Sequence, residues 1–452
     1  MTHAPLDVSA HPRNSDLDAA LAEARQRYIA ARPKSAAAHE RARSLMPGGN
    51  TRTVLFYTPF PTAMARGEGC YLEDIDGNRY LDLCGEYTAG LFGHTEPRIQ
   101  AALQAAIANG LNLAAVGEKE AELAAILCAR FPSLERVRFT NSGTEANLMA
   151  LTAARQYTRR QTILGFHGGY HGGLMTFAGG GSPVNAPFPV LLAEYNDTEG
   201  ALALIREHAA EIAAVILEPM MGGGGCIPAE REFLVELRAA THEAGAVLIF
   251  DEVMTSRHSV GGLQKLYGIT PDLTTLGKYV AGGMSFGAFG GQAEVMGVFD
   301  AYRPGALPHS GTFNNNVLSM TAGTVAMGRI FDDAAAEALR VRGEALRTAL
   351  NAVCTRHSVA MQFTGIGSMM QPHFRTGRIL RPYVPAPSED GLRELFFLDI
   401  MTAGIYPARR GMVALSLPVG EDECACFVDA VDEFCASRRP LLVPAAAAGG
   451  SA

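Results

Sequence analysis

The feature that most restricts this chain is an alternation of helical and extended segments between residues 98 and 330. The expected helices span residues 97–109, 118–130, 145–157 and 230–244, and the expected strands span 136–140, 161–166, 213–218 and 246–251. Helical spacing alternating with short apolar runs predicts an α/β fold, with an open, mainly parallel sheet and helices on both faces. Such sheets bind their ligands at the carboxyl ends of the strands.

The flanking segments differ from this central region. Residues 15–46 have helical spacing with Ser15 as the expected cap, and residues 69–83 alternate around an Asp-Gly turn, which predicts a hairpin. Four parts are therefore expected: an N-terminal helix and β segment of a small domain (1–84), a large α/β domain (85–333), the C-terminal part of the small domain (334–440) and a low-complexity, disordered tail (441–452).

The composition limits the classes of function. The chain has 452 residues, a net charge of −8, 48% hydrophobic and 19% charged residues, which fits a soluble globular enzyme. It has no basic cluster with interleaved aromatics, no apolar run long enough for a membrane span and no secretory signal, so we expect a cytoplasmic protein without nucleic-acid or membrane partners. The eight scattered cysteines predict reduced thiols and no metal site.

One lysine stands out. The chain has only four, and Lys278 lies among apolar and glycine residues, where an ammonium loses solvation and the neutral, nucleophilic amine is favoured. The apolar run 246–250 ends in Asp251, which places an acid at the carboxyl end of a buried strand. A Schiff-base lysine and a buried aspartate facing a pyridinium nitrogen are what pyridoxal phosphate requires.

A phosphate cup is expected at Ser142, Gly143 and Thr144, which follow the expected strand 136–140 and open a helix. Their N–H and hydroxyl groups and the positive helix N-terminus suit an anion. An ordinary helix cap explains the same residues, but Lys278 and Asp251 favour the phosphate interpretation.

Further candidates flank these groups. Tyr170 lies between glycines after the expected strand 161–166 and can stack on a planar ring, although a structural role explains it equally well. Val253 can pack on the opposite face of that ring, and the role of His171 stays open. The polar loop 309–316, with Thr312, is either a second phosphate-contacting loop or a solvated loop.

Five ordered motifs carry a family resemblance. Residues 46–55, 142–146, 170–172, 251–255 and 271–278 resemble the fold-type I, class III pyridoxal-phosphate aminotransferases, in particular their glutamate-1-semialdehyde aminomutase branch, and the likeness runs from about 40 to 420. A narrower set looks like the β-amino-acid aminotransferases that act on β-phenylalanine: residues 55–57, 86–90, 310–316, 361–365 and 410–411.

The resemblance implies a homodimer with shared active sites, Lys278 as Schiff-base lysine, Asp251 as pyridine partner and Ser142, Gly143 and Thr144 as phosphate donors. It also implies that Thr312 reaches in from the partner subunit and that Arg52 and Arg410 bind carboxylates. Tyr87, with Phe56 and Tyr57, can line an apolar substrate pocket. Three features depart from the wider family or are ambiguous: Met254 replaces a glutamine, Gly223 replaces a glutamate, and Arg409 is adjacent to Arg410.

These residues predict a ping-pong aminotransferase that works through a Lys278 aldimine. It would move the amino group of an aromatic β-amino acid to a 2-oxo acid such as 2-oxoglutarate or pyruvate. Two alternatives are an aminomutase of the glutamate-1-semialdehyde type and a non-catalytic pyridoxal-phosphate-binding protein.

Overall fold

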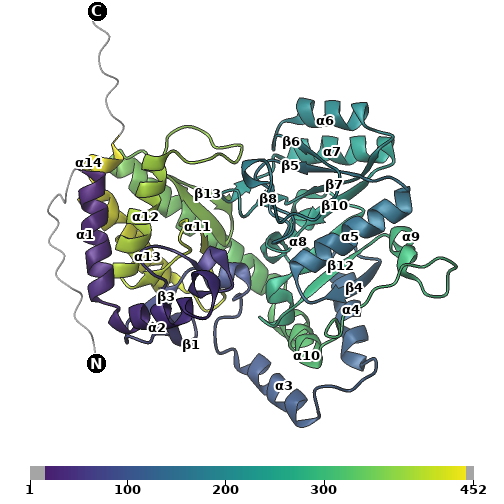
Figure 1. Cartoon of the computed structure of the whole chain (residues 1–452), viewed down its shortest axis with the longest axis horizontal. Coiled ribbons are helices and arrows are strands. Elements are labelled where there is room, and N and C mark those ends of the chain that lie inside the picture. Colours follow the sequence, from purple (N-terminus) through teal and green to yellow (C-terminus); the bar gives the residue numbers. More distant parts are fainter. Residues whose placement is uncertain (1–15, 444–452) are drawn as a thin grey trace, which may run out of the picture.

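Seven strands form the main sheet of the computed structural model, which describes residues 16–443 (Figure 1). Their order is β4-β12-β11-β10-β7-β5-β6, and all run parallel except β12, which is antiparallel to both neighbours. The strands are β4 (Arg136–Thr140), β5 (Thr162–Phe166), β6 (Val190–Ala193), β7 (Ile212–Leu217), β10 (Val247–Asp251), β11 (Leu273–Gly277) and β12 (Gly287–Gly291). The predicted mainly parallel α/β sheet is confirmed.

Alternate residues of the central strands pack on opposite faces of the sheet. Ala214, Ile216, Val247 and Ile249 pack with apolar residues of α5 (Gly143–Thr158). The intervening residues of β7 and β10 pack with α6 (Thr198–Glu207) and α7 (Arg231–Ala244) on the other face. Strands buried on both faces read as continuous apolar runs, which is why β7 and β10 were predictable from the sequence.

β12 was not predicted because three of its five residues are glycine. The close packing of β12 against neighbouring backbone explains why it is rich in glycine. A Cβ on Gly287 would lie 2.1 Å from the Ser142 carbonyl oxygen, and a Cβ on Gly291 would lie 2.0 Å from that of Asp272. Only glycine fits where neighbouring backbone segments lie this close. Because glycine has no side chain, β12 lacks the alternating pattern by which a strand is usually recognised in a sequence.

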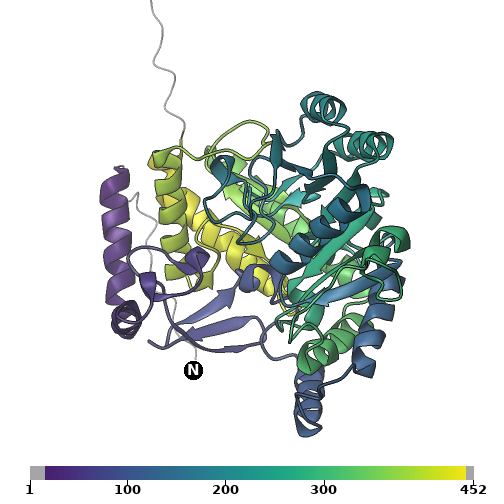
Figure 2. The same ribbon diagram turned by 45° about the vertical axis from the view of Figure 1, so that its right-hand side comes forward.

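The second lobe joins the two ends of the described chain. β1 (Met64–Glu68), β2 (Tyr71–Asp74) and β3 (Arg79–Asp82) form a sheet that β15 (Ile405–Tyr406) completes, parallel to β3. A further sheet contains β13 (Gln362–Ile366), β14 (Met369–His373) and β16 (Val413–Ala414). Figures 1 and 2 show the purple helix α1 (Leu17–Ala30) beside the yellow-green helix α12 (Pro387–Thr402).

The remaining elements complete the two lobes. They are α2 (Pro33–Arg43), α3 (Pro97–Ala108), α4 (Glu118–Arg130), β8 (Met220–Met221), β9 (Ile227–Pro228), α8 (Gly262–Tyr267), α9 (Ala293–Met296), α10 (Val317–Val325), α11 (Asp333–His357), α13 (Glu421–Ser437) and α14 (Arg439–Leu442). Between residues 16 and 443, no helix combines the length and the apolar character that crossing a membrane requires.

Two expectations for the chain ends need correction. Residues 16–46 form two helices rather than one, because Pro33 cannot continue a helix and instead begins α2. Asp16 caps α1, with its Oδ1 accepting from the Ala19 N–H at 2.8 Å, whereas the expected cap Ser15 lies outside the described residues. Leu442, assigned to the tail, lies in α14 and is buried, while residues 444–452 are outside the described part. The domain boundaries drawn from the sequence stay predictions.

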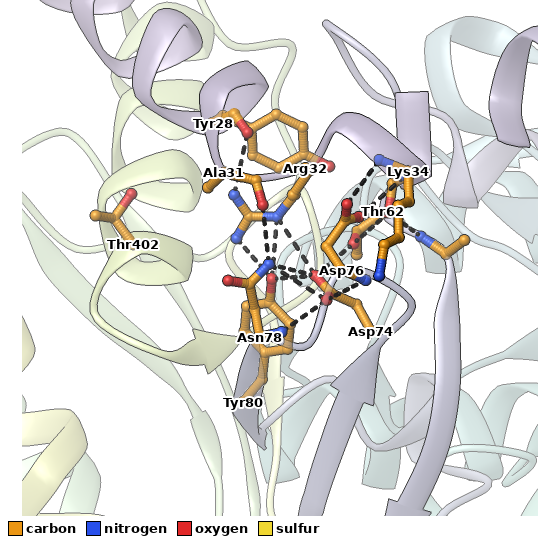
Figure 3. Close-up of polar contacts among 12 residues, drawn as sticks. Tyr28, Ala31, Arg32, Lys34, Thr62, Asp74, Asp76, Asn78, Tyr80 and Thr402 are labelled. Atoms are coloured by element: carbon orange, nitrogen blue, oxygen red, sulfur yellow. Dashed lines mark hydrogen bonds and ion pairs between the residues drawn. The ribbon is translucent and has the colours of Figure 1, made fainter. Parts of the chain in front are cut away.

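A cluster of polar residues joins α2 to the hairpin of β2 and β3 (Figure 3). Asp76 caps α2 from a distant part of the chain, accepting from the Lys34 N–H at 2.6 Å and from the Ser35 N–H at 3.0 Å. Asp74 accepts from the Tyr80 hydroxyl at 2.7 Å, and that hydroxyl accepts from Arg32 Nε at 3.0 Å. This network positions α2, whose end leads into the segment that carries Arg52.

Replacing Asp76 with alanine tests this network. Asp76→Ala leaves two N–H groups of the first turn of α2 without their acceptor, so we expect a loss of about 1–2 kcal/mol in the free energy of unfolding. Urea titration followed by circular dichroism measures the loss. Glu40→Ala, which removes an exposed ion pair with Arg43 on the same helix, should change stability by less than about 0.5 kcal/mol. Equal effects of the two variants would contradict the capping role.

Candidate active site

The pairing of β10 with β11 places the two principal candidates at one edge of the sheet. The strands are parallel, with Asp251 opposite Thr275, and Lys278 follows β11 directly. Gly277 lies against its neighbours so closely that a Cβ there would be 3.3 Å from Val253 and 3.6 Å from the Gly143 Cα. Residues separated by more than 100 positions therefore meet at the carboxyl ends of the strands.

The Lys278 amine is the electrostatic centre of this edge. Its Nζ donates to the Tyr87 carbonyl oxygen at 2.6 Å. Burial lowers the pKa of the Lys278 amine to about 8, the positive charge of Arg410 adds to the decrease, and the negative charge of Asp251 partly offsets it. With this pKa about a tenth of the amine is neutral and nucleophilic at pH 7, far more than for an unperturbed lysine, which agrees with the expectation from the sequence.

Asp251 is held by partners on three sides. Its Oδ2 lies 2.8 Å from both Asn147 Nδ2 and His171 Nδ1, and its Oδ1 accepts from the Val253 N–H at 3.0 Å. Thr275 donates to Asn147 Oδ1 at 2.6 Å, which orients the amide towards Asp251. The open role of His171 is resolved in the geometry: it is a buried partner of Asp251. Neither Asn147 nor Thr275 was distinguishable in the sequence from ordinary core polar residues.

The predicted phosphate-binding residues Ser142, Gly143 and Thr144 lie at the N-terminus of α5. Ser142 Oγ accepts from the Glu145 N–H at 3.2 Å, so the capping interpretation of Ser142 is correct in this structure. The N–H groups of Gly143 and Thr144 belong to the first turn, where helices have no internal acceptors. A Cβ on Gly143 would lie 2.9 Å from Val253, so only glycine lets this helix end approach the strand edge so closely. The cup thus retains N–H donors for an anion.

Tyr170 and Thr312 are more exposed than the groups around Asp251. Tyr170 is 49% exposed, and its N–H donates to Glu218 Oε1 at 3.1 Å. Thr312 is also exposed, on a loop that Asn314 ties to Asn141 next to the cup, with 2.9 Å between the amide nitrogen and oxygen. The stacking role of Tyr170 and the partner-subunit role of Thr312 stay predictions.

Glu218 is a buried acid that the sequence reasoning did not assign to the site. Its two oxygens accept from the N–H groups of Tyr170 and Gly222, at 3.1 and 2.9 Å. Burial and the charge of Asp251 raise the pKa of Glu218 to about 7, against the opposite influence of His171. The signal that could have found it is its position at the end of the apolar run of β7, the same signal that identified Asp251.

The two predicted carboxylate-binding arginines flank one aromatic ring. The guanidinium carbons of Arg52 and Arg410 lie 5.8 and 5.6 Å from the centroid of Tyr87. Arg409 turns away from this ring and pairs with Glu394 at 3.3 Å and Asp390 at 3.7 Å. This geometry favours Arg410 over Arg409.

The backbone that carries Tyr87 is strained. Gly85, Glu86, Tyr87 and Thr88 have φ values of 52°, 47°, 53° and 82°, a left-handed turn in which three residues are not glycine. Each such residue costs about 1–2 kcal/mol. This left-handed turn directs the Tyr87 carbonyl towards Lys278 and the Tyr87 ring towards both arginines. Tyr57, in contrast, is buried in the core of the other lobe against Phe397 and does not line this site.

Comparison with known proteins identifies the class. The aminotransferase class-III family model matches residues 56–393, so the chain belongs to this family. Pyridoxal phosphate, the cofactor of these enzymes, fits the donors present: an amine of lowered pKa, a strand-end aspartate and a helix N-terminus that only glycine allows so near. The chain is a pyridoxal-phosphate-dependent aminotransferase, with an amino acid and a 2-oxo acid as substrates.

Particular relatives are similar over almost the whole chain. The β-phenylalanine transaminase of Variovorax paradoxus is 50% identical over 426 residues, which cover 94% of this chain and 98% of that protein. The crystal structure of the β-phenylalanine aminotransferase from the same organism has a TM-score of 0.93 at 49% identity, covering 95% of this chain and all of that one. A glutamate-1-semialdehyde 2,1-aminomutase from Methanothermobacter thermautotrophicus is 36% identical, covering 88% and 95% of the two chains. The resemblance inferred from the motifs is confirmed.

The lowered pKa of Lys278 makes stability depend on pH. Since the pKa is lower in the folded state, the unfolded state holds the extra proton between about pH 8 and 10.5, so folding is penalised below pH 8 and the penalty vanishes as pH rises through this range. We expect cofactor-free Lys278→Met to be more stable than the parent at pH 7, by up to about 3 kcal/mol, and equal near pH 10.5.

Urea unfolding of the cofactor-free proteins at several pH values measures this difference. Lys265→Met is the matched control, because Lys265 is half-exposed and lies 3.6 Å from Asp333. A stability difference between Lys278→Met and the parent that does not vary with pH would show that the Lys278 amine titrates normally.

Proposed function

We propose that this aminotransferase moves the amino group of an aromatic β-amino acid, of the β-phenylalanine type, to a 2-oxo acid such as 2-oxoglutarate or pyruvate. One observation carries the proposal: Arg52 and Arg410 lie on the ring of Tyr87, whose carbonyl accepts from the Lys278 amine. Carboxylate-binding groups thus lie close to the amine that acts on the substrate. The similarity to the V. paradoxus enzyme supports the same substrate class.

Each predicted group has a task in this reaction. Bound pyridoxal phosphate supplies an electron sink, which makes the proton on the amine-bearing carbon removable. Lys278 Nζ would remove and return that proton, and Asp251, oriented by Asn147 and His171, would pair with the pyridine nitrogen. Ser142, Gly143 and Thr144 would hold the phosphate, and Tyr170 and Val253 would pack against the two faces of the ring.

Substrate recognition falls to the arginines. A guanidinium binds a carboxylate through two parallel charge-assisted hydrogen bonds, so Arg52 and Arg410 serve the carboxylates of the amino donor and of the 2-oxo acid. A β-amino acid separates its amine from its carboxylate by one more carbon than an α-amino acid. Tyr87 lines the substrate side chain, and Arg410 is the second carboxylate ligand rather than Arg409.

The assembly proposed is a homodimer in the cytoplasm. Thr312 is exposed on a loop next to the phosphate cup, and we propose that it contacts the cofactor phosphate of the partner subunit. Eight cysteines without disulfides fit a reducing compartment.

Removal of the Lys278 amine tests the catalytic assignment. Lys278→Ala should lower kcat for transamination by at least about a hundredfold, because the only proposed proton-transfer group is lost. The visible absorbance of the bound cofactor should shift at the same time, as seen by spectrophotometry. Lys265→Ala is the control and should retain parental turnover. Parental amino-group exchange by Lys278→Ala would overturn the assignment.

A donor screen tests substrate class and carboxylate recognition. Aromatic β-amino acids should be better donors than aliphatic β-amino acids, α-amino acids and 1-phenylethylamine. Arg52→Ala should raise KM for the carboxylate donors by about tenfold to a hundredfold, since a hydrogen bond between charged groups is lost. Equal use of amines without a carboxylate would contradict the arginine roles. Internal rearrangement without an acceptor would indicate an aminomutase instead.

A further inference from the structure

An acidic residue forms an ion pair with one of the two arginines proposed to bind the substrate. Glu86 Oε1 accepts from Arg52 Nη1, and both side chains are about half exposed, at 56% and 44%. Under the proposed function, Arg52 binds the carboxylate of the substrate. The same guanidinium therefore has two possible carboxylate partners, one from the chain and one from the substrate.

The backbone of Glu86 is positioned independently of this ion pair. Asp82 Oδ1 accepts from the N–H groups of Cys84 and Gly85, at 3.0 and 2.9 Å, where the left-handed turn begins. The Tyr87 hydroxyl donates to the Val54 carbonyl at 2.9 Å, which ties the turn to the segment that carries Arg52. Glu86 is held beside Arg52 by the fold, and its side chain can leave the arginine without unfolding the turn.

Glu86 also lines a cavity. It has a volume of about 560 Å³, and its lining includes Glu86, His39, Asn50, Asp82 and His94 but neither Arg52 nor Lys278. Glu86 thus contacts Arg52 and also lines this cavity. The Glu86 side chain is already about half exposed, so water can solvate its carboxylate when it leaves Arg52.

We propose that Glu86 is a specificity-determining residue that neutralises Arg52 between turnovers and gives up its place to the carboxylate of the substrate. In this exchange the substrate carboxylate replaces the Glu86 carboxylate at Arg52. The ion pair between Arg52 and the substrate therefore compensates for the lost ion pair between Arg52 and Glu86. An amine without a carboxylate leaves the ion pair intact and gains nothing from Arg52. Because half-exposed ion pairs are weak, the competition costs the substrate only a small factor in affinity.

The test compares two donors that differ only in the carboxylate arm, β-phenylalanine and 1-phenylethylamine, with the parent enzyme and Glu86→Gln in their cofactor-bound forms. We expect Glu86→Gln to lower KM for β-phenylalanine by about two- to fivefold, because the internal competitor is gone. Its kcat should stay within about twofold of the parent, because Glu86 takes no part in proton transfer. KM for 1-phenylethylamine should not fall.

Two control variants sharpen the comparison. Glu86→Asp keeps the charge but shortens the side chain by one methylene, so its KM for β-phenylalanine should lie between those of the parent and Glu86→Gln. Glu337→Gln removes a surface ion pair with Arg340 on α11 and should leave both KM values unchanged. A KM for β-phenylalanine that is unchanged or higher in Glu86→Gln would overturn the proposal, since Glu86 would then be a bystander or would orient Arg52.

Binding of 3-phenylpropanoate, measured by titration calorimetry with the cofactor-bound enzyme, separates this inference from the proposed function. This ligand has the carboxylate and the ring but no amine. Tighter binding to Glu86→Gln than to the parent supports the inference even if the parent does not transaminate β-phenylalanine, a result that would refute the proposed function alone. Equal or weaker binding refutes the inference while leaving transamination by the parent untouched.

Discussion

The parallel pairing of β10 with β11 is the constraint on which the rest of the site depends. It sets Asp251 opposite Thr275 and brings Lys278 to the same edge of the sheet. Both strands are buried along their whole length, so their register is specified by packing on both faces. Shifting either strand by one residue would exchange its inward and outward faces and move an ionisable group away from its partners.

Charges at this edge are arranged so that the lysine stays reactive. Burial and Arg410 disfavour the ammonium form of Lys278, while Asp251 limits the shift, which leaves the pKa near 8. A second buried acid, Glu218, accepts with its two oxygens from backbone N–H groups of two glycine-containing loops. These interactions fix loops that carry no regular secondary structure, where packing alone would leave the substrate side of the site loosely defined.

Strain is concentrated where recognition and chemistry meet. The left-handed turn from Gly85 to Thr88 is unfavourable for its three non-glycine residues, yet it places the Tyr87 carbonyl within hydrogen-bonding distance of Lys278 and the Tyr87 ring near two arginines. The cost of this turn is offset by the hydrogen bonds that Asp82 accepts from backbone N–H groups and by the one that the Tyr87 hydroxyl donates. A relaxed turn would separate the Lys278 amine from Arg52 and Arg410, the two arginines proposed to bind the substrate carboxylate.

Local chemistry in the sequence alone determined much of this protein. The apolar runs of β7 and β10, the helix start at Ser142 and the isolated Lys278 were all readable because burial and capping leave short, recognisable patterns. Ordered motifs added the family. The split between α1 and α2, the glycine-rich strand β12 and the end of the described chain at α14 were not anticipated, since a proline inside a helical pattern and glycines selected by backbone approach give weak signals.

Only the tertiary structure decided which distant groups meet. Asn147, His171 and Thr275 gather around Asp251 because three strands and a helix converge there, and no spacing in the chain reports that convergence. The proposal of Arg410 rather than Arg409 as carboxylate ligand comes from the different contacts of two adjacent side chains, and the pairing of Arg52 with Glu86 depends on a left-handed turn. Long-range contacts of this kind arise from sheet register and loop conformation, which are properties of the whole packed chain.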